Sequence, residues 1–196
     1  MASMQTVSFS DLTVAPTGEP LTEAQREVPR LVRDRIRSGA PITDVLDTMV
    51  ALLHERCPKH AWTGVYLAEG DTLVLGPFRG PDTPHHRIRI GTEGICGWVA
   101  GNATPQVIPD VNADPRYLMC SATIRSEIVV PIARDGRVFG VIDIDSEIPA
   151  AFRNEDLELL SELAGIVAPA FPALPETPGP AAPASSPTPP YPKDRA

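Results

Sequence analysis

The chain has 196 residues, of which 42% are hydrophobic and 21% are charged, which is typical of one globular domain. Its formal net charge of −8 and pI of about 5.0 argue against nucleic acid or an anionic membrane as the main partner. Three cysteines are too few, and odd in number, for a structural disulfide framework. We therefore expect a cytoplasmic protein with reduced thiols.

The two ends of the chain differ in composition from the middle. Residues 1–20 mix Ser, Thr, Pro and Gly and have neither the basic start nor the apolar run of a secretory signal. Residues 172–196 are rich in Pro, Ala and Ser. Because neither segment can bury enough apolar surface to offset its ordering entropy, we predict that both are disordered. Residues 21–171 are expected to form one domain, without a segment that spans a bilayer.

Two helices are expected at the start of this domain. Residues 22–38 are predicted to be mostly helical, with Thr22 as the N-cap and Gly39 as the stop. Pro29 lies inside this span, so we expect a kink or a break there. A second helix is predicted over 43–57, where apolar residues recur at helical spacing before a proline.

The rest of the domain is predicted to consist mainly of short strands. They cover residues 61–67, 72–75, 86–90, 106–108, 127–133 and 138–145. Turn residues join the first two strands, and an Asp-Gly turn joins the last two. A short helix is expected at 94–101 and a closing helix at 154–168. This order indicates an α+β fold, an antiparallel sheet with helices packed on one face.

Two aspartates interrupt the last predicted strand. Asp143 and Asp145 stand at i and i+2, so their side chains share one face of the strand, and Glu127 opens the neighbouring strand. Carboxylates in apolar strands are costly to bury unpaired, so we interpret the three as functional. An ion pair with Arg87 or Arg137 is the structural alternative. Three close carboxylates cannot all ionise cheaply, so at least one should hold a proton near neutrality.

The three cysteines stand in different settings. Cys120 lies in a polar loop near Arg116 and Arg125, which favours a functional thiol and, through the arginine charge, a thiolate. Cys96 lies at the start of a short predicted helix, whose N-terminus would lower its pKa. A second functional thiol and a packing role remain equally open for Cys96. Cys57, at a helix end, is interpreted as structural.

Trp62 and Tyr66 stand at i and i+4 on the first predicted strand, with Gly64 between them. They are either core aromatics or a flat wall whose glycine gap suits a methyl thioether. His85 and His86 have no companion ligands at metal spacing, so we expect a solvated loop and no metal site.

Several motifs resemble a known family. They are Trp62-Thr63-Gly64-Val65-Tyr66-Leu67, Asp71-Thr72-Leu73-Val74-Leu75-Gly76-Pro77-Phe78-Arg79-Gly80, Gly94-Ile95-Cys96-Gly97, Ser126-Glu127-Ile128-Val129-Val130-Pro131 and Gly140-Val141-Ile142-Asp143-Ile144-Asp145-Ser146. Over roughly residues 45–168 the chain is similar to GAF domains and, more narrowly, to the free methionine-(R)-sulfoxide reductases that use this fold.

The resemblance implies roles for individual residues. The matching positions are Cys120 for the nucleophile, Glu127, Asp143 and Asp145 for the catalytic acids, and Trp62 and Tyr66 for the aromatic substrate pocket. It implies reduction of free L-methionine (R)-sulfoxide through a cysteine sulfenic acid. The expected electron donor is an external thiol such as thioredoxin, without a metal or organic cofactor.

One element of the family pattern is missing. Many members carry a resolving cysteine just before the third strand, where this chain has Pro84-His85-His86. Either Cys96 or an external thiol then resolves the sulfenic acid, and we favour the external thiol. The alternatives to an enzyme are a non-catalytic GAF sensor of a small molecule or of oxidation at Cys120, and an adaptor acting through the Pro-rich tail. Whether the chain forms a homodimer stays open.

Overall fold

Residues 19–172 are the part of the chain that the computed structural model describes. Its strands are β1 (Trp62–Glu69), β2 (Thr72–Arg79), β3 (Arg87–Arg89), β4 (Gln106–Ile108), β5 (Ser126–Arg134) and β6 (Arg137–Ser146). They form one antiparallel sheet in the order β3-β2-β1-β6-β5-β4, which confirms the predicted sheet. The two segments predicted to be disordered lie outside the described residues, except for residues 19, 20 and 172.

The helices follow the predicted order. They are α1 (Glu23–Arg26), α2 (Val28–Arg37), α3 (Ile42–Glu55), α4 (Gly94–Asn102) and α5 (Asn154–Val167), with short 3₁₀ helices at Val111–Ala113 and Ala168–Ala170. Among the helices of residues 19–172, none combines the length and the apolar character that crossing a membrane requires.

Local signals set the start of the helical layer. The Thr22 side chain accepts a hydrogen bond from the Gln25 backbone N–H, and the Gln25 side chain accepts one from Thr22 in return. The break predicted within residues 22–38 falls between α1 and α2. Pro29 stands in the first turn of α2, where a missing N–H leaves no hydrogen bond unmade.

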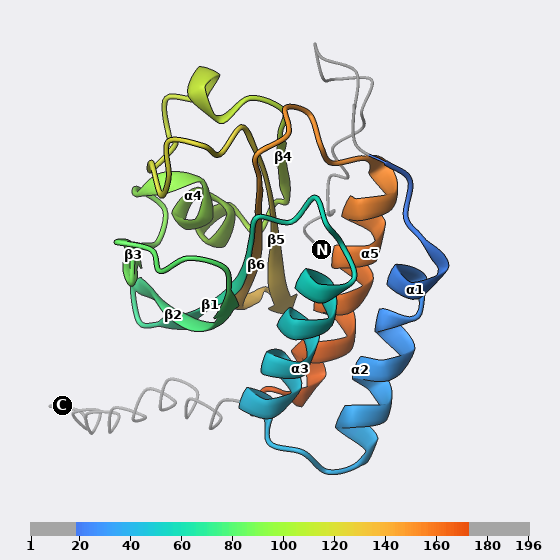
Figure 1. Ribbon diagram of the computed structural model, residues 1–196. Coiled ribbons are helices and arrows are strands. Elements are labelled where there is room, and N and C mark those ends of the chain that lie inside the picture. The colour runs from blue at the N-terminus through green and yellow to red at the C-terminus, as the bar shows by residue number, and fades with distance from the viewer. Residues whose placement is uncertain (1–18, 173–196) are drawn as a thin grey trace, which may run out of the picture.

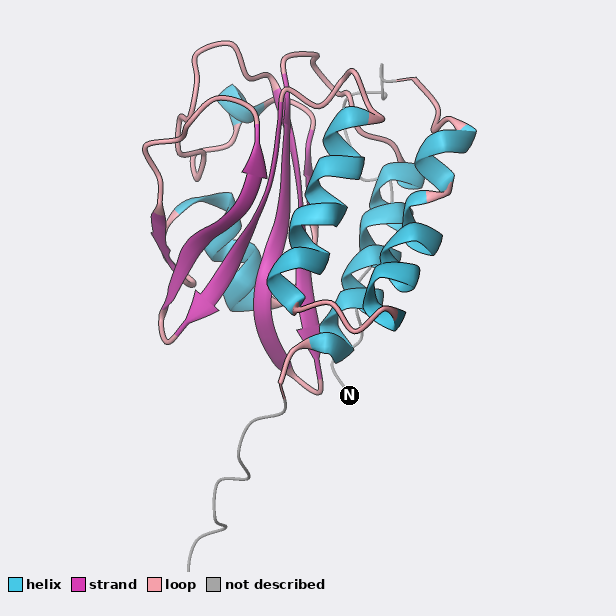
Figure 2. Cartoon of the chain, turned by 60° about the horizontal axis from the view of Figure 1, so that its bottom comes forward, coloured by secondary structure: helices cyan, strands magenta, loops and turns pink. Residues whose placement is uncertain are grey.

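Helices cover both faces of the sheet (Figures 1 and 2). α3 and α5 pack on one face, as predicted, and α2 packs on these two helices. α4 lies on the opposite face and contacts β3, β5 and β6. The absence of a side chain at Gly97 permits this packing, because a Cβ there would stand 2.4 Å from the Arg89 carbonyl oxygen. The prediction of helices on one face therefore holds for the long helices and not for α4.

The sheet separates two apolar clusters, and the strand alternation decides which side each residue faces. Ile142 and Ile144 of β6 belong to the cluster under the long helices, whereas Val141 belongs to the cluster on the α4 face. β5 and β6 pair across a hairpin in which Asp135 and Gly136 both have positive φ, as a type I′ turn requires. From Val141 to Asp145 the odd-numbered residues of β6 thus face α4, whereas Phe139, beyond an irregularity in the β5–β6 pairing, lies in the cluster under the long helices.

Candidate active site

Three carboxylates lie side by side on the α4 face of the sheet. The register places Glu127 of β5 opposite Asp145 of β6, and Asp143 stands two residues before Asp145 on the same strand. Their exposed fractions are only 5%, 3% and 6%, respectively. The strand alternation predicted this shared face for the two aspartates, and the β5–β6 pairing adds the glutamate.

The carboxylates are buried without a cation. Within residues 19–172 no lysine or arginine forms an ion pair with any of them, and Asp143 Oδ1 has no hydrogen-bond partner. Arg137, the structural alternative considered above, lies over the Phe139 ring. Arg116, whose charge acts on Glu127, is bound by Asp114 at 2.6 Å. The scaffold therefore does not neutralise this cluster.

The pKa values of the three carboxyl groups are raised, so that bound protons rather than a cation reduce the charge of the cluster. Burial raises the pKa of Asp143 to about 7, and a hydrogen bond with the Cys96 thiol limits that shift. Burial, together with repulsion from Asp143, raises the pKa values of Glu127 and Asp145 well above their usual range. The cluster therefore holds protons at neutral pH, in agreement with the expectation from the sequence.

The Cys120 side chain reaches the same pocket from the loop that precedes β5. It is half-buried, and its thiol lies 3.5 Å from the Leu118 carbonyl oxygen. Burial and the charges of Asp145 and Asp143 raise the pKa of the Cys120 thiol to about 12, and a hydrogen bond with the Thr83 side chain opposes the shift. The thiol is therefore protonated at neutral pH.

The predicted arginine assistance to Cys120 is wrong. The Arg125 guanidinium donates to the backbone carbonyls of Ala122 and Ile124. Arg116 is held by Asp114. Burial has the largest effect on the pKa of this thiol, followed by the charges of Asp145 and Asp143 on β6.

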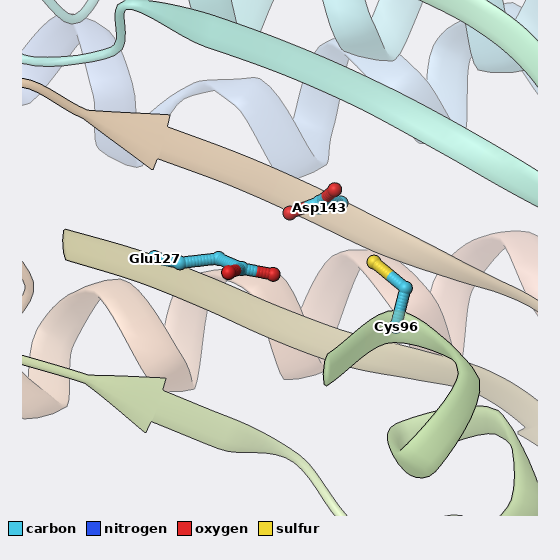
Figure 3. A group of neighbouring side chains, drawn as sticks. All are labelled: Cys96, Glu127 and Asp143. Atoms are coloured by element: carbon cyan, nitrogen blue, oxygen red, sulfur yellow. The ribbon is translucent and has the colours of Figure 1, made fainter. Parts of the chain in front are cut away.

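Cys96 projects from the first turn of α4 toward the carboxylates (Figure 3). Its side chain is 4% exposed, and burial followed by the charges of Asp143 and Glu127 raises the pKa of its thiol well above the ordinary value. The prediction that the helix N-terminus lowers this pKa is therefore wrong, because desolvation and the acids outweigh the helix dipole. Cys57 is also buried but lines neither pocket at this site, which suits a structural role.

The aromatic residues form part of both the core and the site. The Trp62 ring lies 6.1 Å from the Tyr66 ring and stacks on Phe78 at 5.9 Å. It also covers Gly64, where a Cβ would stand 2.2 Å from Trp62 Cη2. The glycine gap predicted for a methyl group is thus filled by the indole. Tyr66 donates its hydroxyl hydrogen to the His85 carbonyl oxygen at 3.0 Å.

An inner pocket between α4 and the sheet brings most of these residues together. It is lined by Tyr66, His85, Ile88, Gly94, Ile95, Cys96, Tyr117, Leu118, Cys120, Glu127, Asp143 and Asp145. A neighbouring outer pocket is lined by Ala61, Trp62, Pro81, Asp82, Thr83, Cys120, Ser121, Thr123, Ile124, Asp145 and Glu147. Cys120 and Asp145 border both, so the thiol can be approached from two sides.

Sequence reasoning missed Thr83, Tyr117 and the pocket position of His85. Thr83 is 4% exposed and adjoins Cys120 and His85. The Tyr117 hydroxyl is buried without a hydrogen-bond partner in the described chain. His85 is half-buried, and its Nε2 lies 3.2 Å from the Met119 carbonyl oxygen. His86 is exposed beside Asp82, as expected for a solvated loop. These residues lie on loops without periodicity, and no spacing could have indicated them.

The fold and the site define a class of protein: a sheet domain that encloses a small pocket lined by two thiols and three buried carboxyl groups whose pKa values are raised. A family model described as GAF domain matches residues 41–171. The chain belongs to the GAF domain family.

Several known proteins of similar sequence and structure are named for the same activity. The free methionine-R-sulfoxide reductase of Escherichia coli (strain K12) is 42% identical over 113 residues, which cover 58% of this chain and 67% of the relative. The X-ray structure of free methionine-R-sulfoxide reductase from Neisseria meningitidis in complex with its substrate has a TM-score of 0.71 at 37% identity, covering 80% of this chain and 95% of that chain. The reduced form of fRMsr of Staphylococcus aureus also has a TM-score of 0.71, at 32% identity, covering 80% and 99%.

Proposed function

We propose that this protein reduces free L-methionine (R)-sulfoxide to methionine, with an external thiol as the electron donor. The observation that carries the proposal is the meeting of the Cys120 thiol in one pocket with three buried acids whose pKa values are raised. The relatives above, which carry this activity in their names, favour an enzyme over a sensor.

The first step joins the thiol to the sulfoxide sulfur. Cys120 Sγ attacks that sulfur while the acid cluster gives a proton to the sulfoxide oxygen, and the thiol proton replaces the one that was given. The sulfur–oxygen bond of the substrate and the new bond between the two sulfur atoms then break, so that the substrate sulfur is reduced and Cys120 Sγ is oxidised by two electrons. The oxygen passes to Cys120 as a sulfenic acid, and methionine leaves. Because Cys120 and Asp145 border the same pocket, this proton exchange needs no distant carrier.

The pocket lining also suits the two ends of the substrate. The apolar wall of Ile88, Ile95 and Leu118, with Tyr66, suits the methyl and methylene groups. Carboxylate charge that remains in the cluster attracts the substrate ammonium. A peptide lacks this ammonium at an internal methionine, so free and peptide-bound substrates should be distinguished.

This specificity is tested by incubating the purified protein with each free methionine sulfoxide epimer and a dithiol, and measuring methionine by chromatography. We expect turnover of the free R epimer, and little or none of the S epimer or of a peptide containing methionine sulfoxide. Equal rates for the free and peptide-bound R forms would contradict recognition of the ammonium, and no turnover of any form would refute the reductase proposal.

We infer that the sulfenic acid is resolved by an external thiol rather than by Cys96. Cys96 is almost fully buried and engaged by Asp143, whereas Cys120 is also open to the outer pocket. An external thiol condenses with the sulfenic acid to form a mixed disulfide and water, and a second thiol releases Cys120. A dithiol such as thioredoxin supplies both, and these steps involve no metal or organic cofactor. The reducing compartment that this requires is consistent with the cytoplasm.

The external route is tested by adding one equivalent of substrate without reductant and trapping the product with a sulfenic-acid reagent. Mass spectrometry should find the adduct on Cys120, because no second thiol reaches it quickly. A rapid Cys96–Cys120 disulfide would contradict the external route. The Cys96→Ser variant is the matched control, since it should give the same Cys120 adduct.

A further inference from the structure

The inner pocket contains a set of atoms suited to a metal ion. Cys96 Sγ, a carboxylate oxygen of Glu127 and one of Asp143 all lie within 4.8 Å of one another. Figure 3 shows the three side chains pointing toward a common space from α4, β5 and β6. All three are buried, so a ligand bound there is shielded from water.

One carboxylate oxygen of this set lacks a hydrogen-bond partner among the described residues. Asp143 is 6% exposed, and its Oδ1 has no hydrogen-bond partner in the described residues. A buried carboxylate oxygen without a donor or cation is uncommon in folded proteins and indicates a site built for a ligand. This observation is independent of the proximity of the three residues.

The donor atoms select the type of ion. Mg²⁺ and Ca²⁺ prefer six or more oxygen ligands, which this pocket does not offer, whereas a cysteine sulfur favours a thiophilic ion. Tetrahedral Zn²⁺ with sulfur at about 2.3 Å and oxygen at about 2.0 Å needs ligand atoms about 3.5 Å apart. The three ligand atoms lie within 4.8 Å of one another, so they would move closer together on binding, and a fourth position is left for water or Asp145.

We propose that Cys96, Glu127 and Asp143 bind a thiophilic divalent cation such as Zn²⁺, which occupies the inner pocket and excludes the substrate. The ion displaces the Cys96 thiol proton to the solvent, and no group is oxidised or reduced. Inhibition of turnover rests on the proposed reductase function, whereas binding of the ion does not. Zn²⁺ is thus a reversible inhibitor that a chelator removes.

Metal binding is tested on the reduced protein without oxygen, using Co²⁺ and Zn²⁺ alone as probes. The Cys120→Ser variant serves as the background, because it removes the other pocket thiol and leaves the three proposed ligands. We expect it to show a thiolate-to-cobalt charge-transfer band and to take Zn²⁺ from a chromogenic chelator. Adding Cys96→Ser should abolish the band and weaken Zn²⁺ binding by more than about 100-fold, beyond the loss typical of a group that only orients a ligand.

Cys57→Ser in the same background is the matched control, because Cys57 is equally buried but outside the pocket, and we expect the band to persist. Asp143→Asn provides a second ligand variant should Cys96→Ser fold poorly by circular dichroism, and we expect it also to weaken Zn²⁺ binding. A band that survives Cys96→Ser, or no band in the background variant, would overturn the proposal. Zinc binding by a protein without reductase activity would refute the function and leave the metal site intact.

Discussion

Replacing Cys120 with serine is expected to abolish turnover of free methionine (R)-sulfoxide, lowering kcat by at least about 10³-fold, as loss of a nucleophile does. The fold should survive, because Cys120 is half-buried in a loop, and a serine hydroxyl can keep the contacts of its thiol with the Leu118 carbonyl oxygen and the Thr83 side chain. Steady-state kinetics with a dithiol and thermal unfolding measure the two effects separately.

Cys57→Ser is the matched control for this experiment. Cys57 is 3% exposed and lies outside both pockets, so its replacement is expected to lower stability slightly and to keep most of the activity. An inactive Cys57→Ser protein beside an active Cys120→Ser protein would reverse the assignment of the thiols.

Asp143→Asn and Asp145→Asn are each expected to lower kcat/KM by a factor on the order of a hundred or more, the usual effect of losing general acid–base assistance. Both side chains face Cys120 and the substrate space from β6, and an amide cannot supply the proton that the departing oxygen needs. Asp135→Asn is a suitable control, because Asp135 is exposed at the β5–β6 turn and its positive φ is tolerated by asparagine. Unaltered kinetics in both cluster variants would make the carboxylates structural.

The same variants should change how stability depends on pH. Burial raises the pKa of Asp143 from 3.8 to about 7, so the folded chain retains a proton that the unfolded chain releases above pH 4. The stability contribution of this group is therefore complete below pH 4 and is lost as the pH rises through 7. Asp143→Asn is expected to raise the melting temperature more at pH 8 than at pH 5. An equal shift at both pH values would show that the group does not titrate in this range.

Local patterns in the sequence determined much of the fold and part of the site. The Thr22 cap, the break near Pro29 and the Asp135-Gly136 turn depend on residues within a few positions, so short-range sterics and hydrogen bonding specify them. The alternation along β6 likewise placed Asp143 and Asp145 on one face before any partner strand was known.

Only the tertiary structure decided what surrounds these residues. β1 pairs with β6 although strands β2 to β5 lie between them in the sequence. α4 packs on the face opposite the long helices, which brings the Cys96 thiol to the acids. The raised pKa values of both pocket thiols follow from desolvation and from charges contributed by other strands, and nothing in the neighbouring sequence encodes either effect. The Trp62 ring fills the space above Gly64, which the spacing of the two aromatic residues did not indicate. Burial and long-range pairing are properties of the assembled chain, so the sequence pattern predicted the candidate reacting groups and the fold determined their protonation and access.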